Sequence, residues 1–277
     1  MNHTRTLAVA LAALSILASN TALAQTPDSH KPLLLIGASY AEAKTPFNNG
    51  IAPLGGVAAG LGSYLSLGNA LVRHPKLPGY VINEAQAGGG TFARLACARG
   101  ADTCGPAGWD SYQTQLERAL ARVTPPPAPT QINARYVVIV KSNDCMHADA
   151  FGIPQAQTVP CSVDDMNASI DRMIAVGQFA VARGLTPILD KLPQYDHLDL
   201  PLFRTRNNLA WVISESDYNV YRNLYNTRIG AAIPQAVVVD MWADFVHGGD
   251  GIHPSDETNR RAANVIARTL RKLDKAQ

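Results

Sequence analysis

Five polar or glycine residues, spread along the chain, have the types that nucleophilic catalysis requires. Ser39 follows an apolar run and a glycine, which favours a serine exposed at the end of a strand. His253 can take the proton of a serine hydroxyl, and Asp250 can accept the other imidazole N–H and fix its tautomer. The backbone N–H groups of Ser39 and Gly88, with the side-chain amide of Asn143, can hold an oxyanion. Together they predict a Ser39, His253 and Asp250 triad.

Several of these residues also have an alternative interpretation. Ser39 on its own fits a simple turn residue, and the other groups favour the nucleophile. His247 is a rival base six residues before His253. His253 is favoured because Asp250 lies at a suitable separation and a predicted helix starts directly after it. We interpret Asp144 as a structural acid that bonds backbone groups beneath the site, rather than as a second catalytic acid.

Short apolar runs are expected to position these residues. They cover residues 33–36, 80–83, 136–140, 186–190 and 236–240. Nearly continuous apolar runs are typical of strands that are buried on both faces of a parallel sheet. Ligands of such sheets bind beyond the carboxyl ends of the strands. We therefore expect the residues that directly follow the runs to meet in one site.

Segments with helical periodicity separate the apolar runs. The predicted helices cover residues 112–123, 166–183 and 257–273, and Ser255 is the expected N-cap of the last one. This alternation predicts a three-layer α/β domain with right-handed crossovers. The segment 198–229 has two interpretations, a core-facing helix or an aromatic wall for a sugar or an aryl ester. The tyrosines on which both depend are Tyr218, Tyr221 and Tyr225.

Taken in order, the sequence blocks resemble those of the SGNH hydrolases, also called GDSL esterases and lipases. The blocks are Gly37-Ala38-Ser39, residues 83–88, Asn143-Asp144 and residues 250–254. The resemblance covers nearly all of the chain after residue 24. It implies a flavodoxin-like α/β/α sandwich with a five-stranded parallel sheet. It also implies hydrolysis of carboxylic esters through an acyl-enzyme, without a metal or an organic cofactor.

Two residues depart from the pattern of that family. Ala38 stands where the first block usually has Asp, which can loosen the turn that holds Ser39. Lys141 stands where the third block usually begins with Gly, and it adds bulk and charge that can change which acyl group fits. Tyr40 and Ala41 follow the serine, so the chain also lacks the G-x-S-x-G elbow of the α/β-hydrolases.

The first 24 residues are predicted to be a signal peptide. Arg5 provides a positive start, residues 7–19 are apolar or small, and residues 22–24 form an A-x-A cleavage site. Cleavage after Ala24 would leave one catalytic domain, residues 25–277, in the periplasm or outside the cell. An uncleaved membrane anchor is the alternative, although the apolar stretch is too short to span a bilayer. We expect no membrane insertion after cleavage.

Four cysteines are expected to form disulfides in an exported chain. Of the three possible pairings, we favour Cys97 with Cys104 and Cys145 with Cys161, because each pair brackets a single loop. A metal site made of Cys145, His147 and Cys161 is the alternative. Its spacing fits no common zinc pattern, so we predict no metal.

The charge of the chain limits the classes of partner that it can bind. The 277 residues hold 24 Lys and Arg against 22 Asp and Glu, and the basic residues form no cluster, which argues against nucleic acid. We therefore expect a small-molecule or glycan ester as substrate, with a short acyl group such as acetyl. An acyltransferase on the same triad and a non-catalytic carbohydrate-binding protein are the alternatives. The oligomeric state stays open.

Overall fold

The computed structural model describes residues 31–42, 66–77, 81–86, 88–97, 104–124, 132–148 and 159–276. The predicted signal peptide lies outside these residues and stays a prediction. Within the described part of the chain, no helix combines the length and the apolar character needed to span a bilayer.

Five parallel strands form the central sheet. They are β1 (Leu33–Ile36), β2 (Val81–Asn83), β5 (Tyr136–Ile139), β6 (Thr186–Asp190) and β7 (Val237–Val239), in the order β2-β1-β5-β6-β7. Every residue of β1 and β5 is buried, as the continuous apolar runs predicted. The predicted five-stranded parallel sheet is thus confirmed, with differences of one residue at some strand ends.

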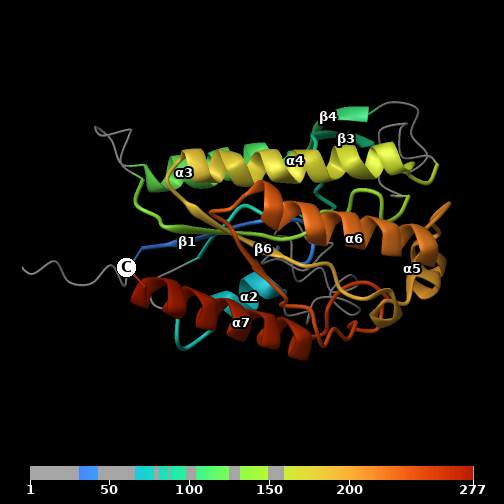
Figure 1. The fold of residues 1–277 in the computed structure, drawn as a ribbon. Coiled ribbons are helices and arrows are strands. Elements are labelled where there is room, and N and C mark those ends of the chain that lie inside the picture. Colours follow the sequence, from blue (N-terminus) through green and yellow to red (C-terminus); the bar gives the residue numbers. More distant parts are fainter. Residues whose placement is uncertain are drawn as a thin grey trace, which may run out of the picture.

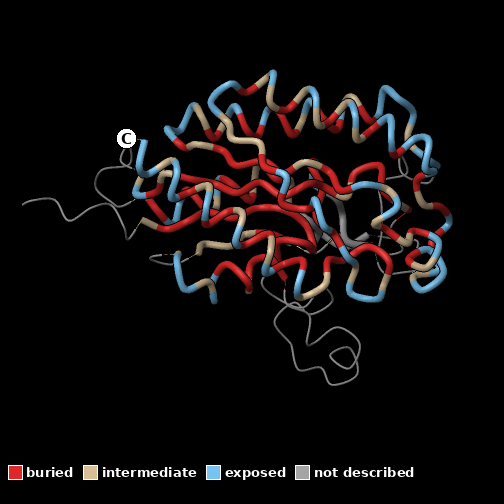
Figure 2. Tube along the Cα trace, turned by 60° about the horizontal axis from the view of Figure 1, so that its bottom comes forward, coloured by how far each residue is buried: buried red, intermediate tan, exposed pale blue. Residues whose placement is uncertain are grey.

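Helices cover both faces of this sheet (Figure 1). Helices α3 (Tyr112–Val123), α4 (Val163–Ala182) and α6 (Glu215–Ala232) lie on one face, and α2 (Leu67–Val72) and α7 (Asp256–Lys275) lie on the other. The buried residues gather along the sheet and the inner sides of the helices, while exposed residues lie outside (Figure 2). The three-layer α/β arrangement is therefore confirmed.

Serine caps fix where these helices begin. Ser66, Ser111, Ser162, Ser214 and Ser255 each accept a hydrogen bond from a backbone N–H three residues ahead. The cap of α7 is the predicted one, and Asp256 and Glu257 follow it in the first turn, where they favour the helix dipole. Because Ser255 lies two residues after His253, its cap also fixes the chain directly behind the candidate base.

The ambiguous segment 198–229 forms two helices rather than one. A short helix α5 (Leu200–Asn207) ends at Asn208, whose φ of 49° is left-handed, and α6 follows it. The three tyrosines of α6 are at most 1% exposed, and their hydroxyls bond inside the protein. The core-facing interpretation is confirmed, and the aromatic wall was a wrong alternative.

A two-stranded antiparallel sheet was not predicted. It consists of β3 (Arg94–Cys97) and β4 (Cys104–Trp109), and it precedes α3. Strand β4 has the sequence CGPAGW, and its glycines and proline are unfavourable in strands, which hides it from a pattern search. The register places the backbones of Cys97 and Cys104 opposite each other. Their disulfide stays a prediction.

Candidate functional site

Ser39 lies in a sharp turn directly after β1. Gly37 begins this turn with a φ of 153°, and its N–H donates to Oε1 of Gln115 at 2.9 Å. A Cβ at Gly37 would lie only 3.0 Å from the Cβ atoms of Ala41 and Val140, so the turn requires glycine here. The buried strand and this glycine together hold Ser39 at the carboxyl end of the sheet.

Three predicted residues meet at this turn. Nε2 of His253 lies 2.8 Å from Oγ of Ser39, and Nδ1 of His253 hydrogen bonds to Oδ2 of Asp250. The other carboxylate oxygen, Oδ1, accepts the backbone N–H groups of Ile252 at 3.0 Å and His253 at 2.9 Å. The rival His247 is instead bonded to the backbone N–H of Gly249. The structure thus pairs Ser39 with His253.

The electrostatics of Asp250 suit an acid that orients a base. Burial by itself would raise the pKa of Asp250, but the hydrogen bonds from the His253 side chain and from two backbone N–H groups lower the pKa to about 2. The carboxylate is therefore ionised at neutral pH. It can stabilise the imidazolium that forms when His253 takes the proton of Ser39.

The turn that carries Asp250 and His253 packs on helix α5. Gly251, with a φ of 98°, accepts a hydrogen bond from the N–H of Asp199 at 2.8 Å, and a Cβ at Gly251 would overlap the carbonyl of Asp199. The ring of Phe203 lies edge-on to that of His253, with centroids 6.2 Å apart. Helix α5, which the sequence did not reveal as a separate element, therefore supports the base.

The segment after β2 is tied to the serine turn. Nδ2 of Asn83 donates to the carbonyl of Ala41 at 2.8 Å, and the N–H of Gln86 donates to the carbonyl of Gly37 at 3.1 Å. Gly88 follows with a φ of 76°, a conformation that favours glycine. The loop that contains this predicted oxyanion donor is thus anchored beside Ser39.

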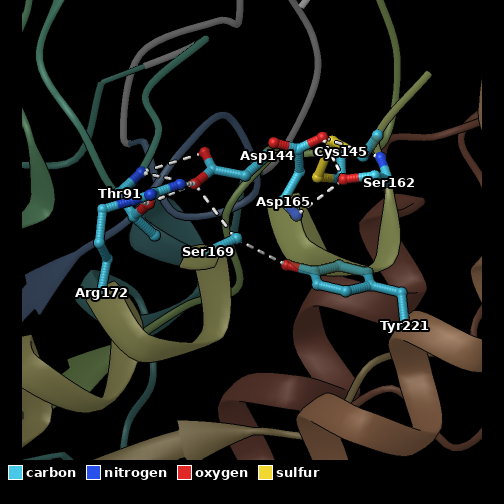
Figure 3. The surroundings of a disulfide bond; sticks show 9 residues. Thr91, Asp144, Cys145, Ser162, Asp165, Ser169, Arg172 and Tyr221 are labelled. Atoms are coloured by element: carbon cyan, nitrogen blue, oxygen red, sulfur yellow. Dashed lines mark hydrogen bonds and ion pairs between the residues drawn. A yellow bond between two sulfur atoms is a disulfide. The ribbon is translucent and has the colours of Figure 1, made fainter. Parts of the chain in front are cut away.

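A buried carboxylate joins the two predicted oxyanion blocks. Asp144, directly after Asn143, accepts hydrogen bonds from the backbone N–H of Thr91 at 3.1 and 3.3 Å and from Oγ of Ser169 at 3.2 Å (Figure 3). Nη2 of Arg172 lies 3.4 Å from the same carboxylate. Since Thr91 belongs to the glycine-rich loop after β2, Asp144 connects this loop to the Asn143 block. Its contacts agree with the structural interpretation.

A disulfide follows this block. Cys145 and Cys161 are bonded to each other, as predicted, across a sequence separation of 16. Their sulfurs are therefore unavailable to a metal, and the described ranges of the chain contain no other group of side chains that could hold one. The alternative metal site with His147 was wrong. The disulfide closes the loop directly after Asn143 and Asp144.

A buried charged pair beneath the serine turn was missed from the sequence. Asp190 ends β6 and is fully buried, and its carboxylate accepts Nε1 of Trp242 at 2.8 Å and the backbone N–H of Lys141 at 3.1 Å. Burial raises the pKa of Asp190 to about 6 and lowers the pKa of Lys141 to about 8. The sequence signal that could have revealed this pair was an acidic residue, Asp190, at the end of an apolar run that was predicted to be buried.

Comparisons with known proteins identify the fold. The sequence matches no family profile, and no curated protein matches it in sequence. The structure is similar to the aryl esterase of M. smegmatis, with 17% identity, a TM-score of 0.54 and coverage of 88% of this chain and 99% of that one. A proposed SGNH hydrolase from Slackia heliotrinireducens gives 16% identity, a TM-score of 0.50 and coverage of 87% and 99%. The chain therefore has the three-layer α/β fold of the SGNH hydrolases.

Proposed function

We propose that this protein is an exported serine ester hydrolase. The observation that carries the proposal is the continuous set of hydrogen bonds from Asp250 through His253 to Oγ of Ser39. A serine hydroxyl bonded to an imidazole, which a carboxylate orients in turn, is the arrangement that nucleophilic acyl transfer needs. The fold shared with an aryl esterase supports the same conclusion.

The reaction proceeds in two halves. His253 accepts the hydroxyl proton of Ser39 at Nε2 while Oγ attacks the ester carbonyl carbon, and it then returns the proton to the departing alcohol as the ester C–O bond breaks. In the second half, His253 deprotonates a water that attacks the acyl-serine. The new C–O bond forms, the bond to Oγ breaks, and the proton returns to Ser39 as the carboxylic acid leaves.

The oxyanion of each tetrahedral intermediate is assigned to three donors. These are the backbone N–H groups of Ser39 and Gly88 and the side-chain amide of Asn143. The proposal rests on their blocks, which are anchored beside the serine turn and joined by Asp144. One such donor typically contributes about 3 kcal/mol to lowering the barrier.

A short acyl group is the proposed substrate class, such as acetyl carried by a carbohydrate. The predicted export of the protein places it where polysaccharide esters occur. Neither the donors nor the triad call for a cofactor in this mechanism.

Hydrolysis of p-nitrophenyl esters with two to eight acyl carbons tests the proposal. We expect residues 25–277 to hydrolyse the acetyl ester best and the Ser39→Ala variant to lose turnover. A competing alcohol in the same assay would reveal transfer to an acceptor through new ester products. Folded wild type without turnover on any ester, together with binding of glycans, would instead support the non-catalytic alternative.

A further inference from the structure

Lys141 has a buried ammonium group. Its side chain follows β5, the residue is 1% exposed, and Nζ has no hydrogen-bond partner in the described part of the chain. A buried lysine without such a partner is rare, because burial disfavours its charged form. Nζ instead lies over the ring of Tyr40, 4.2 Å from its centroid, which is the geometry of a cation–π interaction.

The ring of Tyr40 connects this ammonium to the proposed catalytic turn. Tyr40 directly follows Ser39, is 1% exposed, and stacks on Phe245 with centroids 5.9 Å apart. Its hydroxyl donates to the carbonyl of Ile252, whose N–H donates to Oδ1 of Asp250. One aromatic side chain therefore joins the serine turn to the turn that carries the acid and the base.

The charged and titratable groups around Lys141 come from several elements. Asp190 at the end of β6 is its buried counter-charge, and Tyr225 of α6 donates to that carboxylate at 3.3 Å. Tyr112 of α3 donates to the carbonyl of Lys141 at 2.9 Å. On the side of the site, the ring of His253 lies 6.0 Å from that of Tyr40.

We propose that Lys141 is a positioning residue, whose ammonium holds the Tyr40 ring so that this ring keeps the Asp250 and His253 turn against Ser39. The inference rests on the proposed hydrolase function and deepens it. The lysine touches neither the ester nor the reacting atoms. Its contribution belongs to kcat, because it acts on the alignment of the triad rather than on the binding of the ester.

The positioning depends on the proton of Lys141. A neutral amine loses the attraction to the ring, so the triad loosens as pH rises through the pKa of Lys141, which burial lowers to about 8. We therefore expect kcat to fall above about pH 8. A serine triad alone predicts a rise with deprotonation of its histidine and then a plateau.

Pairs of variants test this inference through the pH profile of kcat on p-nitrophenyl acetate. In Lys141→Met, which keeps an unbranched side chain only one atom shorter and removes the charge, we expect kcat at pH 7 to fall about tenfold, with KM unchanged and no alkaline decrease. In Lys141→Arg, whose charge persists above pH 12, we expect the decrease near pH 8 to disappear while activity remains. Tyr40→Phe, combined with Lys141→Met, should lower kcat no further than either change alone.

Lys272→Met, an exposed residue of α7, is the matched control and should keep the wild-type profile. The inference is wrong if Lys141→Met keeps the wild-type kcat and alkaline limb, or if a folded Lys141→Arg still loses activity near pH 8. An NMR titration of the His253 imidazole separates this result from a failure of the proposed function. If no ester is hydrolysed, a His253 titration that changes in Lys141→Met but not in Lys272→Met still supports the positioning, and an unchanged one overturns it.

Discussion

Both carboxylate oxygens of Asp250 are engaged, one by the imidazole of His253 and the other by two backbone N–H groups. Such bonding does two things at once, since it fixes the turn and holds the carboxylate ionised. An ionised acid beside Nδ1 keeps the proton on that nitrogen and leaves Nε2 free to accept the proton of Ser39. In the proposed mechanism, the same contacts of Asp250 therefore serve both the structure of the turn and the catalysis.

Asp250→Asn separates these two contributions. An amide keeps the size but loses the charge, so we expect kcat to fall on the order of a thousandfold to ten-thousandfold.

The pH dependence of the free energy of unfolding is a second test of the Asp250 carboxylate. Because the folded pKa of about 2 is below the ordinary value, the wild type has added stability above pH 4, and it loses about 2 kcal/mol of this as pH falls towards 2. Urea unfolding between pH 2.5 and 6 should show a slope that is steeper in the wild type than in the variant by this amount, since the other carboxylates titrate in both, and equal slopes would contradict the assignment.

Among the elements, the glycine-rich loop after β2 and the block after β5 are built as one unit. Asp144 receives the N–H of Thr91 and a hydroxyl from α4, and the disulfide closes the chain just beyond it (Figure 3). Neither loop has the regular backbone hydrogen bonds of a strand or a helix. In the described part of the chain, the buried carboxylate of Asp144 therefore joins the two loops, and Gly90 approaches this carboxylate closely.

Gly90→Ala tests this close approach. A Cβ at Gly90 would lie 2.5 Å from Oδ1 of Asp144, so the carboxylate has to move. We expect a loss of about 1–3 kcal/mol in stability and a lower kcat, because both predicted oxyanion blocks shift. Gly230→Ala in α6 is the matched control, since its Cβ would lie 3.4 Å from Val238 in ordinary contact. Equal effects of the two variants on kcat would contradict the expectation.

Removing the disulfide tests the other end of the same block. In the double variant Cys145→Ser and Cys161→Ser, the unfolded chain is no longer constrained across a separation of 16 residues. The loss of this constraint should lower the free energy of unfolding by about 3 kcal/mol, as measured by urea titration without reductant. An unfolding midpoint equal to that of the wild type would show that the bond contributes no stability.

The sequence predicted those elements whose pattern is local. Buried strands such as β1 and β5 read as continuous apolar runs, and Ser39, Asp250 and His253 follow strand ends within short motifs. The pair of Lys141 and Asp190 could not be predicted, because the two residues are 49 positions apart in the sequence and become neighbours only where β5 and β6 pair. The β3–β4 hairpin was missed because its glycines and proline oppose the usual strand signal.

For the whole molecule, the site depends on the complete sheet. Ser39 and His253 meet across 214 residues of sequence, from the first strand to the turn before the last helix. Helix α7 then runs away from the site towards the C-terminus (Figure 1). The described chain forms one continuous hydrophobic core, so we expect no part of the site to survive without the rest.

The dependence of the site on the whole fold can be tested by comparing the loss of activity with the loss of helical structure in urea. Ester hydrolysis and far-ultraviolet circular dichroism, followed in the same urea series, should have the same midpoint, because the triad is assembled by the global fold. Loss of activity at clearly lower urea, with the helical signal intact, would instead show that the turn of His253 opens by itself.

The long separation between the serine and its base has a consequence for the life of the chain. In a polypeptide that is exported unfolded, as its predicted signal peptide implies, Ser39 and His253 stay apart throughout the export. Chemistry becomes possible only when the last tenth of the chain has arrived and docked. If the protein is the proposed esterase, the position of His253 near the end of the chain would keep it inactive until it has left the compartment where it was made.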